Sequence, residues 1–266
     1  MNCSPLRKDS KTIIGMAHLG ALPGSPLYDA DGGPERLVEA VLADIEALQE
    51  GGVDAILFGN ENDRPYQLSA PAEGIAAMSA VISAVRPHLR VPFGVNYLWD
   101  PSASVAIAAA TGATFVREIF TGVFASDMGV WSPDAARAVR LRRTLGREDL
   151  RLFYNINAEF AHSLDQRPIE LRARSAVFSS LADAVLVSGP LTGQSAATSD
   201  LRSVAEAVPD VPVLANTGVN RDNVGEILSL ADGCIVGTHF KVGGDTWKPV
   251  ERERVARFME VVDRQR

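Results

Sequence analysis

Eight short runs of apolar, largely β-branched residues recur along the chain, and their spacing constrains the fold more than any other feature. From Ile13 to Cys234 they define seven intervals over 221 residues, about 32 residues each, and one strand–helix unit takes roughly 30 residues. Runs such as 55–58 and 184–187 are apolar at every position, as strands covered on both faces are. The pattern predicts a single (β/α)8 TIM barrel. The runs are 12–17, 55–58, 93–97, 114–119, 150–156, 184–187, 211–215 and 233–236.

Amphipathic segments with helix signals lie between these runs. Pro34 stands at a first helical position, and Leu37, Val41 and Leu48 repeat at helical spacing before Gly51. No linker or low-complexity stretch divides the chain, so we expect residues 11–266 to form one domain after a flexible segment at 1–10. The same reasoning predicts further helices at 72–85, 102–110, 133–145, 169–181, 200–207, 221–230 and 249–262.

Composition excludes several classes of protein. The longest uninterrupted apolar stretch, 105–110, is far shorter than the roughly 18 residues that span a bilayer. The polar N-terminus lacks an apolar signal core, so we expect a cytosolic protein without a membrane span. A net charge of −7 argues against a nucleic-acid binder, which needs clustered Lys and Arg. Cys3 and Cys234 are too few for a disulfide framework, which favours reduced thiols.

Polar residues follow most of the runs, at the strand ends where TIM barrels perform their chemistry. Carboxylates and histidine are the side chains suited to proton transfer there, and amide and guanidinium groups are suited to hold a substrate. The candidate catalytic residues are His18, Glu61, Asp63, Glu118, Asp127 and Glu159. The candidate substrate-binding residues are Asn60, Asn96, Arg117, Asn155, Asn157 and Asn216.

Several candidates also have a purely structural explanation. His18 could be a packed histidine bonded to backbone, and Glu61 and Asp63, two residues apart, could fasten their loop to the next helix. Arg117 and Glu118 alternate sides of a regular strand, so only one of them should face the barrel axis.

Two later candidates leave similar alternatives open. Asp127, in the glycine-containing loop 121–131, either closes over the site or caps the helix that begins near Pro133. Glu159 and His162 form an acid–base pair or serve as turn residues.

The loops after the seventh and eighth runs predict a phosphate site. TIM barrels often bind phosphate there through backbone N–H groups, and glycine lets the backbone approach the anion. The alternative is that the glycines only shape tight turns. Thr192 and Gly193 could add donors, and His239 and Lys241 could add cationic contacts or stand at the surface. The expected phosphate-binding residues are Ser188, Gly189, Thr217, Gly218, Gly237 and Thr238.

Sharper catalytic motifs are absent from the sequence. It contains no Walker loop, no G-x-G-x-x-G after the first run, no H-E-x-x-H and no G-x-S-x-G. No run ends in a lysine of the kind that forms a Schiff base. A divalent metal is possible, but no ligand spacing is diagnostic, and no other cofactor is implied. Its possible ligands are His18, Glu61, Asp63, Glu118 and Glu159.

Several segments of the chain match the motifs of a known family. They are 14–18, 22–26, 51–54, 60–63, 92–96, 115–117, 215–219 and 231–238, with Gly122, Asp127, Phe240 and Lys241. Together they resemble the BtpA family, and more narrowly its SgcQ-like branch. The resemblance covers nearly the whole chain from Lys11. It implies a TIM barrel akin to the ribulose-phosphate-binding barrels, in a family named for a role in photosystem I accumulation. Other members look like parts of carbohydrate or nucleoside uptake pathways.

The chain departs from the wider family at one place. Glu159 and Phe160 stand where that family commonly has a Lys-His pair. The change suggests a distinct substrate for this branch.

Two functions therefore remain open. The first is a cytosolic isomerase, lyase or hydrolase that acts on a small phosphorylated sugar or a nucleoside-derived sugar phosphate. The second is a noncatalytic biogenesis or regulatory scaffold of the BtpA type. The expected partner is a phosphorylated small molecule, and because barrels commonly associate we expect a homo-oligomer.

Overall fold

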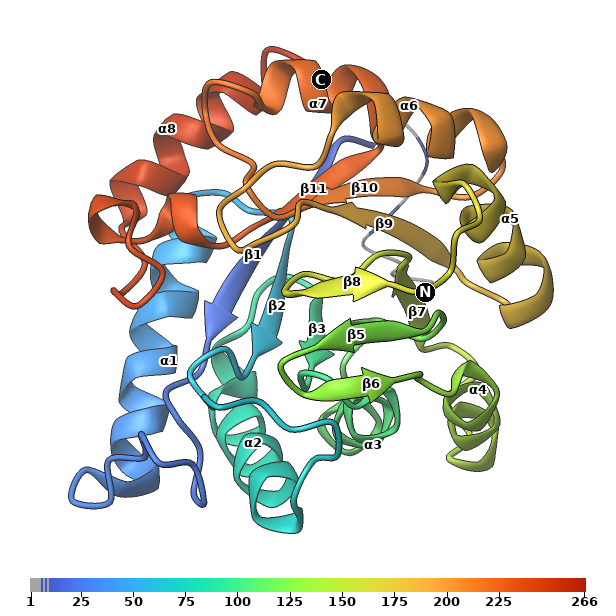
Figure 1. The fold of residues 1–266 in the computed structure, drawn as a ribbon. Helices are drawn as coiled ribbons and strands as arrows, with labels where there is room; N and C mark the ends of the chain where they lie inside the picture. Colours follow the sequence, from blue (N-terminus) through green and yellow to red (C-terminus); the bar gives the residue numbers. More distant parts are fainter. Residues whose placement is uncertain (1–5, 7, 9) are drawn as a thin grey trace.

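The computed structural model describes residues 6, 8 and 10–266 and contains a closed barrel of eight parallel strands (Figure 1). Every barrel strand coincides with a predicted run to within two residues, so the predicted TIM barrel is confirmed. The order around the barrel is β1-β11-β10-β9-β7-β4-β3-β2. The strands are β1 (Thr12–His18), β2 (Ala55–Gly59), β3 (Phe93–Asn96), β4 (Phe115–Glu118), β7 (Arg151–Asn155), β9 (Ala184–Ser188), β10 (Val213–Asn216) and β11 (Gly233–Val236).

Helices follow the barrel strands and surround them (Figure 1). Where a helix begins or ends, the reason is often local: Asp100 and Asp134 accept hydrogen bonds from backbone amides of the first turns of α3 and α4, and Gly112 takes the left-handed conformation after α3. The helices are α1 (Gly33–Glu50), α2 (Ala72–Val85), α3 (Pro101–Thr111), α4 (Ala135–Thr144), α5 (Ile169–Ser180), α6 (Thr198–Ala207), α7 (Val224–Leu230) and α8 (Arg252–Val262). Short 3-10 turns are η1 (Arg86–His88), η2 (Thr238–Phe240) and η3 (Val242–Gly244).

A small antiparallel sheet, absent from the sequence-based prediction, lies where β4 and β7 end (Figure 1). It consists of β5 (Phe124–Ser126), β6 (Gly129–Trp131) and β8 (Ala161–Ser163), in the order β6-β5-β8. The interpretation of these segments as loop and turn was therefore wrong. Strands of three residues are too short to show an alternating pattern. In addition, β5 pairs with β8, and the two are separated in the sequence by β6, α4 and β7.

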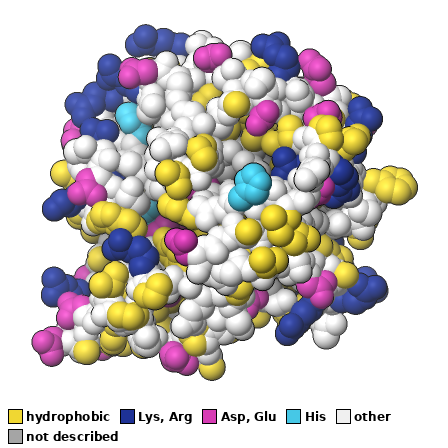
Figure 2. All heavy atoms as spheres, in the orientation of Figure 1, with side chains coloured by type: hydrophobic (Ala, Val, Ile, Leu, Met, Phe, Trp, Pro, Cys, Tyr) yellow, Lys and Arg dark blue, Asp and Glu magenta, His cyan; other side chains and the backbone are white. Residues whose placement is uncertain are grey.

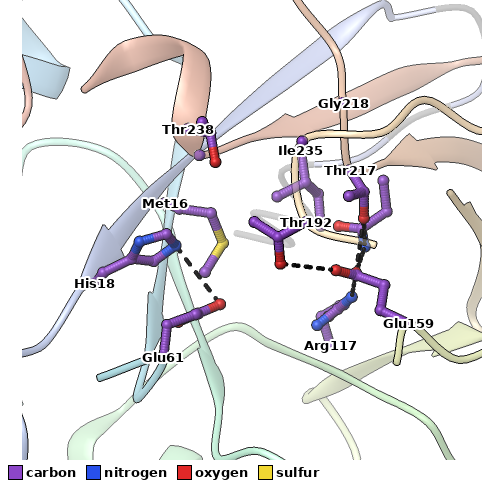
Figure 3. Close-up of a pocket in the computed structure, with 13 residues that line it drawn as sticks. Met16, His18, Glu61, Arg117, Glu159, Thr192, Thr217, Gly218, Ile235 and Thr238 are labelled. Carbon is purple, nitrogen blue, oxygen red and sulfur yellow. Dashed lines mark hydrogen bonds and ion pairs between the residues drawn. The ribbon is translucent and has the colours of Figure 1, made fainter. Parts of the chain in front are cut away.

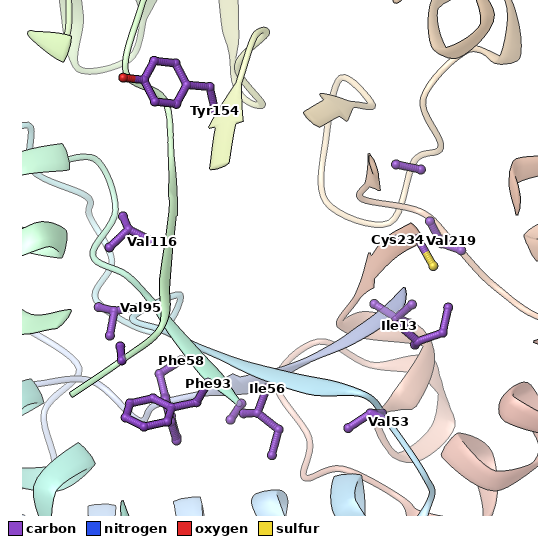
Figure 4. Close-up of a cluster of buried hydrophobic side chains, with 14 of the residues drawn as sticks. Ile13, Val53, Ile56, Phe58, Phe93, Val95, Val116, Tyr154, Val219 and Cys234 are labelled. Carbon is purple, nitrogen blue, oxygen red and sulfur yellow. The ribbon is translucent and has the colours of Figure 1, made fainter. Parts of the chain in front are cut away.

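The core has two layers, set by the alternation of side chains along each strand. Side chains that face outward from the strands, such as Ile13, pack against the helices and form the outer layer. Figure 4 shows part of this layer. Ile14, Met16 and Leu57 point into the barrel, where Phe115 stacks on Phe153 with ring centroids 4.8 Å apart. The barrel is therefore filled with side chains, and any cavity must lie above this packed floor.

One described residue near the N-terminus, Leu6, is buried and packs inside the barrel. Most of the segment expected to be flexible, 1–10, and Cys3 lie outside the described residues. Cys234 is buried as a free thiol. Within the described ranges, no helix is both long and apolar enough to cross a bilayer.

Candidate functional site

The polar residues at the strand ends continue the inward-facing positions of the barrel. Met16 and Phe115 belong to the interior layer, so His18 and Arg117, two residues further along their strands, face the axis above them. The same alternation turns four more polar side chains inward, which are Asn96, Asn155, Ser188 and Asn216. A layer of hydrogen-bonding groups thus lies directly above the apolar floor.

A cavity of about 430 Å³ opens above this layer (Figure 3). Its wall is formed by the ends of β1, β4, β10 and β11 and by the loops after β2, β7 and β9. The structure brings together candidates from all of these elements. The candidates that line the cavity are His18, Glu61, Arg117, Glu159, Asn216, Thr217, Gly218, Gly237 and Thr238.

One wall carries a histidine–carboxyl pair. Nε2 of His18 lies 3.5 Å from Oε1 of Glu61. Burial, together with the nearby Lys241 ammonium, lowers the pKa of His18 to about 3, so the imidazole is neutral at neutral pH. Burial raises the pKa of Glu61 above its ordinary value. Oε2 of Glu61 is buried and has no hydrogen-bonding partner in the described part of the chain.

The opposite wall is organised by Glu159 (Figure 3). Its Oε1 accepts hydrogen bonds from Oγ1 of Thr217 at 2.6 Å, Nδ2 of Asn216 at 3.0 Å and a guanidinium nitrogen of Arg117 at 3.3 Å. Its Oε2 accepts from Oγ1 of Thr192 at 3.4 Å. Oγ of Ser188 also donates to Oε1, at 3.5 Å. Five donors, one of them charged, suit a fixed carboxylate. Glu159 is therefore held in place by side chains from β4, β10 and the loop after β9.

Arg117 is in turn oriented through a chain of buried groups. It donates to Oδ1 of Asn96 at 2.9 Å, and Nδ2 of Asn96 donates to Oε2 of Glu118. Oε1 of Glu118 accepts from the amide of Ile119 at 2.8 Å. Burial raises the pKa of Glu118 to about 8. Of the adjacent pair only Arg117 lines the cavity, as strand alternation predicts, and Glu118 is linked to Arg117 through Asn96.

Asp63 and Asn60 connect loops rather than line this cavity. Asp63 accepts from the amide of Leu22 at 2.6 Å and from Nδ2 of Asn60 at 3.2 Å. Oδ1 of Asn60 accepts from the amide of Leu98 at 2.8 Å. These bonds join the segments after β1, β2 and β3. The alternative of a loop fastened by a carboxylate fits Asp63, whereas Glu61 faces the cavity.

Asn155 and Asn157 link the end of β7 and the loop after it to Ser188 at the end of β9, and neither lines the cavity. Asn157 forms two hydrogen bonds with the backbone of Ser188, at 2.8 Å to its amide and 2.6 Å to its carbonyl. Asn155 donates to Oγ of Ser188 at 2.8 Å. Asp127 is exposed at the turn between β5 and β6, outside the cavity. The suggestion that it caps the next helix was wrong, because Asp134 does so.

The phosphate-site loops combine free amides with tight packing. Thr217 and Gly218 both take left-handed conformations, at φ +71° and +66°. A Cβ atom on Gly218 would lie 2.2 Å from the backbone nitrogen of Ser195, so only glycine fits there. The amides of Gly218 and Thr238 donate to nothing within the described residues. Gly189 fits the turn-shaping alternative, because its Cβ would collide with the carbonyl of Gln194 at 1.8 Å.

The two cationic candidates of the last loop do not reach the cavity. Lys241 is buried, and its Nζ lies 2.7 Å from Oδ2 of Asp44 on α1. Both alternatives for Lys241 were therefore wrong: it does not line the cavity, where it could contact a phosphate, and it does not stand at the surface. His239 packs against Phe258, and burial lowers its pKa. Across the described ranges, no three His, Cys, Asp or Glu side chains gather as a potential metal site.

Two residues that line the cavity were missed by sequence reasoning. Met16 and Ile235 are apolar and lie inside strands, so nothing marked them as functional. Their inward parity, shared with His18 and Gly237, was the signal that could have found them. Thr192 and Gly193, noted as possible donors, do line the cavity.

Fold and site together define a TIM-barrel protein with a small polar cavity at the carboxyl ends of its strands. The chain belongs to the BtpA family, whose model matches residues 9–264.

Two relatives and one solved structure are similar over nearly the full length. The sgc region protein SgcQ of Escherichia coli K12 is 45% identical over 252 residues, 95% of this chain and 94% of SgcQ. The photosystem I biogenesis protein BtpA of Synechocystis is 30% identical, over 94% of this chain and 87% of that protein. The (S)-3-O-geranylgeranylglyceryl phosphate synthase of Thermoplasma acidophilum, solved with its substrate sn-glycerol-1-phosphate, has a TM-score of 0.59 at 17% identity, covering 96% and 94% of the two chains. This last likeness shows a shared fold.

Proposed function

We propose that this protein is an acid–base enzyme that acts on a small phosphorylated sugar or a nucleoside-derived sugar phosphate. The reaction is an isomerase, lyase or hydrolase step inside the barrel cavity. The observation that carries the proposal is the buried pair of His18 and Glu61, with a neutral imidazole and a carboxyl group whose pKa is raised, facing a wall of fixed hydrogen-bonding groups. Perturbed groups of this kind gather at catalytic sites.

Each wall has a separate role in this proposal. The free amides of Gly218 and Thr238 hold the phosphate, as backbone N–H groups do in many barrels. Arg117 and Glu159 bind sugar hydroxyls as donor and acceptor. The solved synthase that binds sn-glycerol-1-phosphate supports the phosphate assignment by analogy of fold.

Proton transfer falls to Glu61 with His18 beside it. Because the pKa of Glu61 is raised, its protonated and ionised forms coexist at a pH nearer to neutral than for an ordinary glutamate. The group can therefore donate a proton and accept it again during one reaction cycle. When Glu61 is protonated, its hydrogen can be donated to the neutral imidazole nitrogen 3.5 Å away or to a substrate oxygen. Because His18 stays neutral, it adds no charge that would compete for the phosphate.

Thermal shift with matched ligands tests the phosphate assignment. We expect ribose 5-phosphate, glucose 6-phosphate or sn-glycerol 1-phosphate to raise the melting temperature, since ligands that bind only the folded state stabilise it. The unphosphorylated counterparts should have little effect. A shift with free sugars and none with any phosphate ester would show that the anion site is wrongly placed.

A noncatalytic scaffold is the second candidate, favoured by the name of the Synechocystis relative, a photosystem I biogenesis protein. The number of ionisable groups held in the cavity favours catalysis, because a scaffold does not need them. The two candidates make different predictions for Glu61→Gln. This substitution abolishes turnover in an enzyme and leaves the function of a scaffold intact.

A further inference from the structure

A second hollow, of about 1060 Å³, lies beside the barrel cavity and has a different character. Its walls are mainly apolar and aromatic, and they come from the loop after β2, from Trp99 after β3, from the turn between β5 and β6, and from the residue before β8. Figure 2 shows hydrophobic side chains gathered on this face over the small sheet. The principal wall residues are Tyr66, Leu68, Trp99, Met128 and Phe160.

This hollow shares its boundary with the barrel cavity. The hydroxyl of Tyr66 donates to the backbone carbonyl of Glu61 at 3.0 Å, and Phe160 follows Glu159 directly in the chain. Glu61 and Glu159 line the barrel cavity, whereas Tyr66 and Phe160 line the hollow. The barrel cavity and the hollow are therefore neighbours, separated by the wall that contains Glu61 and Glu159.

Trp99 supplies an unused hydrogen-bond donor in the wall of the hollow. The residue is only 6% exposed, and its Nε1 has no partner among the described residues. Its ring is fixed by edge contact with Tyr66 and by a tilted contact with Trp131, at centroid distances of 6.1 and 5.8 Å. The neighbouring Trp131 does use its Nε1, which donates to Oγ of Ser126 at 3.0 Å. A buried N–H without an acceptor is unfavourable, so Trp99 is suited to receive a ligand acceptor.

The backbone conformation of Phe160 also indicates a ligand site in this hollow. The residue has a left-handed conformation at φ +54°, and its side chain is 43% exposed. Its amide donates to the carbonyl of Pro190 at 3.1 Å, which holds this conformation. Strained, exposed aromatic residues of this kind are concentrated at ligand sites.

We propose that this hollow binds a planar aromatic group, of the nucleobase kind, carried by the substrate whose sugar phosphate occupies the barrel cavity. The proposal rests on the proposed function and narrows its substrate class. Aromatic walls stack on flat rings, and the N–H of Trp99 donates to an acceptor on the ring. Gln67 and Asp127 also line the hollow and are exposed. The carboxylate of Asp127 can accept from a ring amino group, and the amide of Gln67 can donate to a ring carbonyl.

Calorimetric titration of the full chain with ribose 5-phosphate, the four common nucleoside 5′-monophosphates and the free bases tests this proposal. We expect at least one nucleotide to bind about tenfold more tightly than ribose 5-phosphate, the gain expected from one base stacked on an aromatic side chain. Phe160→Ala and Trp99→Phe should remove most of that gain and leave the affinity for ribose 5-phosphate unchanged. Phe178→Ala is the matched control, because Phe178 is 90% exposed on α5 and lies outside the hollow.

The outcomes separate this proposal from the proposed function. If ribose 5-phosphate binds and no nucleotide binds more tightly, the aromatic subsite is wrong and the phosphate site stands. If a free base binds in a Phe160-dependent way and ribose 5-phosphate does not bind, the subsite stands and the sugar-phosphate function is wrong. If neither class of ligand binds, both proposals are overturned.

Discussion

His18 and Glu61 face each other across 3.5 Å on one wall of the cavity, and Glu159 lies on the opposite wall (Figure 3). The pair comes from the end of β1 and the loop after the neighbouring strand β2, since His18 pairs in register with Gly59, two residues before Glu61. Burial acts on the two groups in opposite ways, lowering the pKa of the imidazole and raising that of the carboxyl. The fold thus holds both groups in their neutral forms more readily than water would.

The depressed pKa of His18 predicts how stability depends on acid. The folded value of about 3 lies below the ordinary 6.5, so the unfolded chain binds the extra proton first. The free energy of unfolding should therefore fall as the pH drops from about 6.5 towards 3, by up to about 1.4 kcal/mol per pH unit from this group. Urea denaturation of the native protein and of His18→Asn across this range measures the difference. Equal slopes would show that His18 is not held neutral.

Glu118 predicts the opposite pH dependence. Its folded pKa of about 8 is above the ordinary 4.5, so its contribution to stability is present below pH 4.5 and is lost as the pH rises through about 8. In Glu118→Gln, the free energy of unfolding should decline less between pH 5 and 8 than in the native protein. Glu253→Gln, a change at the surface of α8, is the control. A decline of the same size in Glu118→Gln would contradict the burial argument.

Gly218 and Gly193 offer a matched pair of substitutions. Both line the cavity and both have positive φ, but only the Cβ of Gly218 would collide with backbone, whereas Gly193 has open space. Gly193→Ala should cost about 1 kcal/mol of stability from backbone conformation alone. Gly218→Ala should cost more and should also weaken binding of phosphate esters. Melting temperatures and calorimetric affinities distinguish the two, and equal effects would remove Gly218 from the anion site.

The buried pair of Lys241 and Asp44 should be needed for the fold. Asp44 accepts from Nζ of Lys241 and from the amide of Val250, both at 2.7 Å. Lys241→Met leaves a buried carboxylate with its charge unpaired, which should destabilise the protein by roughly 3–5 kcal/mol. The double substitution Lys241→Met with Asp44→Asn should recover part of this loss, as chemical denaturation can show. No recovery would mean that packing, rather than charge, explains the effect.

Strand positions and side-chain parity could be predicted from the sequence because both depend on local pattern. Runs covered on both faces are apolar throughout, and the residue two places beyond an inward Met16 or Phe115 must also face inward. Strand parity is therefore enough to direct both His18 and Arg117 towards the barrel axis, where they line one cavity.

The remaining features depend on contacts between distant parts of the chain. Lys241 forms an ion pair with Asp44, which lies 197 residues away in the sequence. Asp63 accepts a hydrogen bond from the amide of Leu22 because the loops after β1 and β2 pack against each other. The sheet formed by β5, β6 and β8 has strands too short to carry a pattern. Roles for these residues follow from tertiary packing, which local periodicity does not encode.

The most direct test of the central claim follows a reaction rather than binding. Native protein and Glu61→Gln are incubated in D2O with phosphorylated sugars and nucleoside monophosphates, and NMR follows both product formation and deuterium uptake. Glu39→Gln, an exposed change on α1, serves as the control. We predict that the native protein and the control convert at least one phosphorylated compound, and that Glu61→Gln is slower by about 100-fold or more. Equal conversion by Glu61→Gln, or conversion of unphosphorylated compounds alone, would contradict the account.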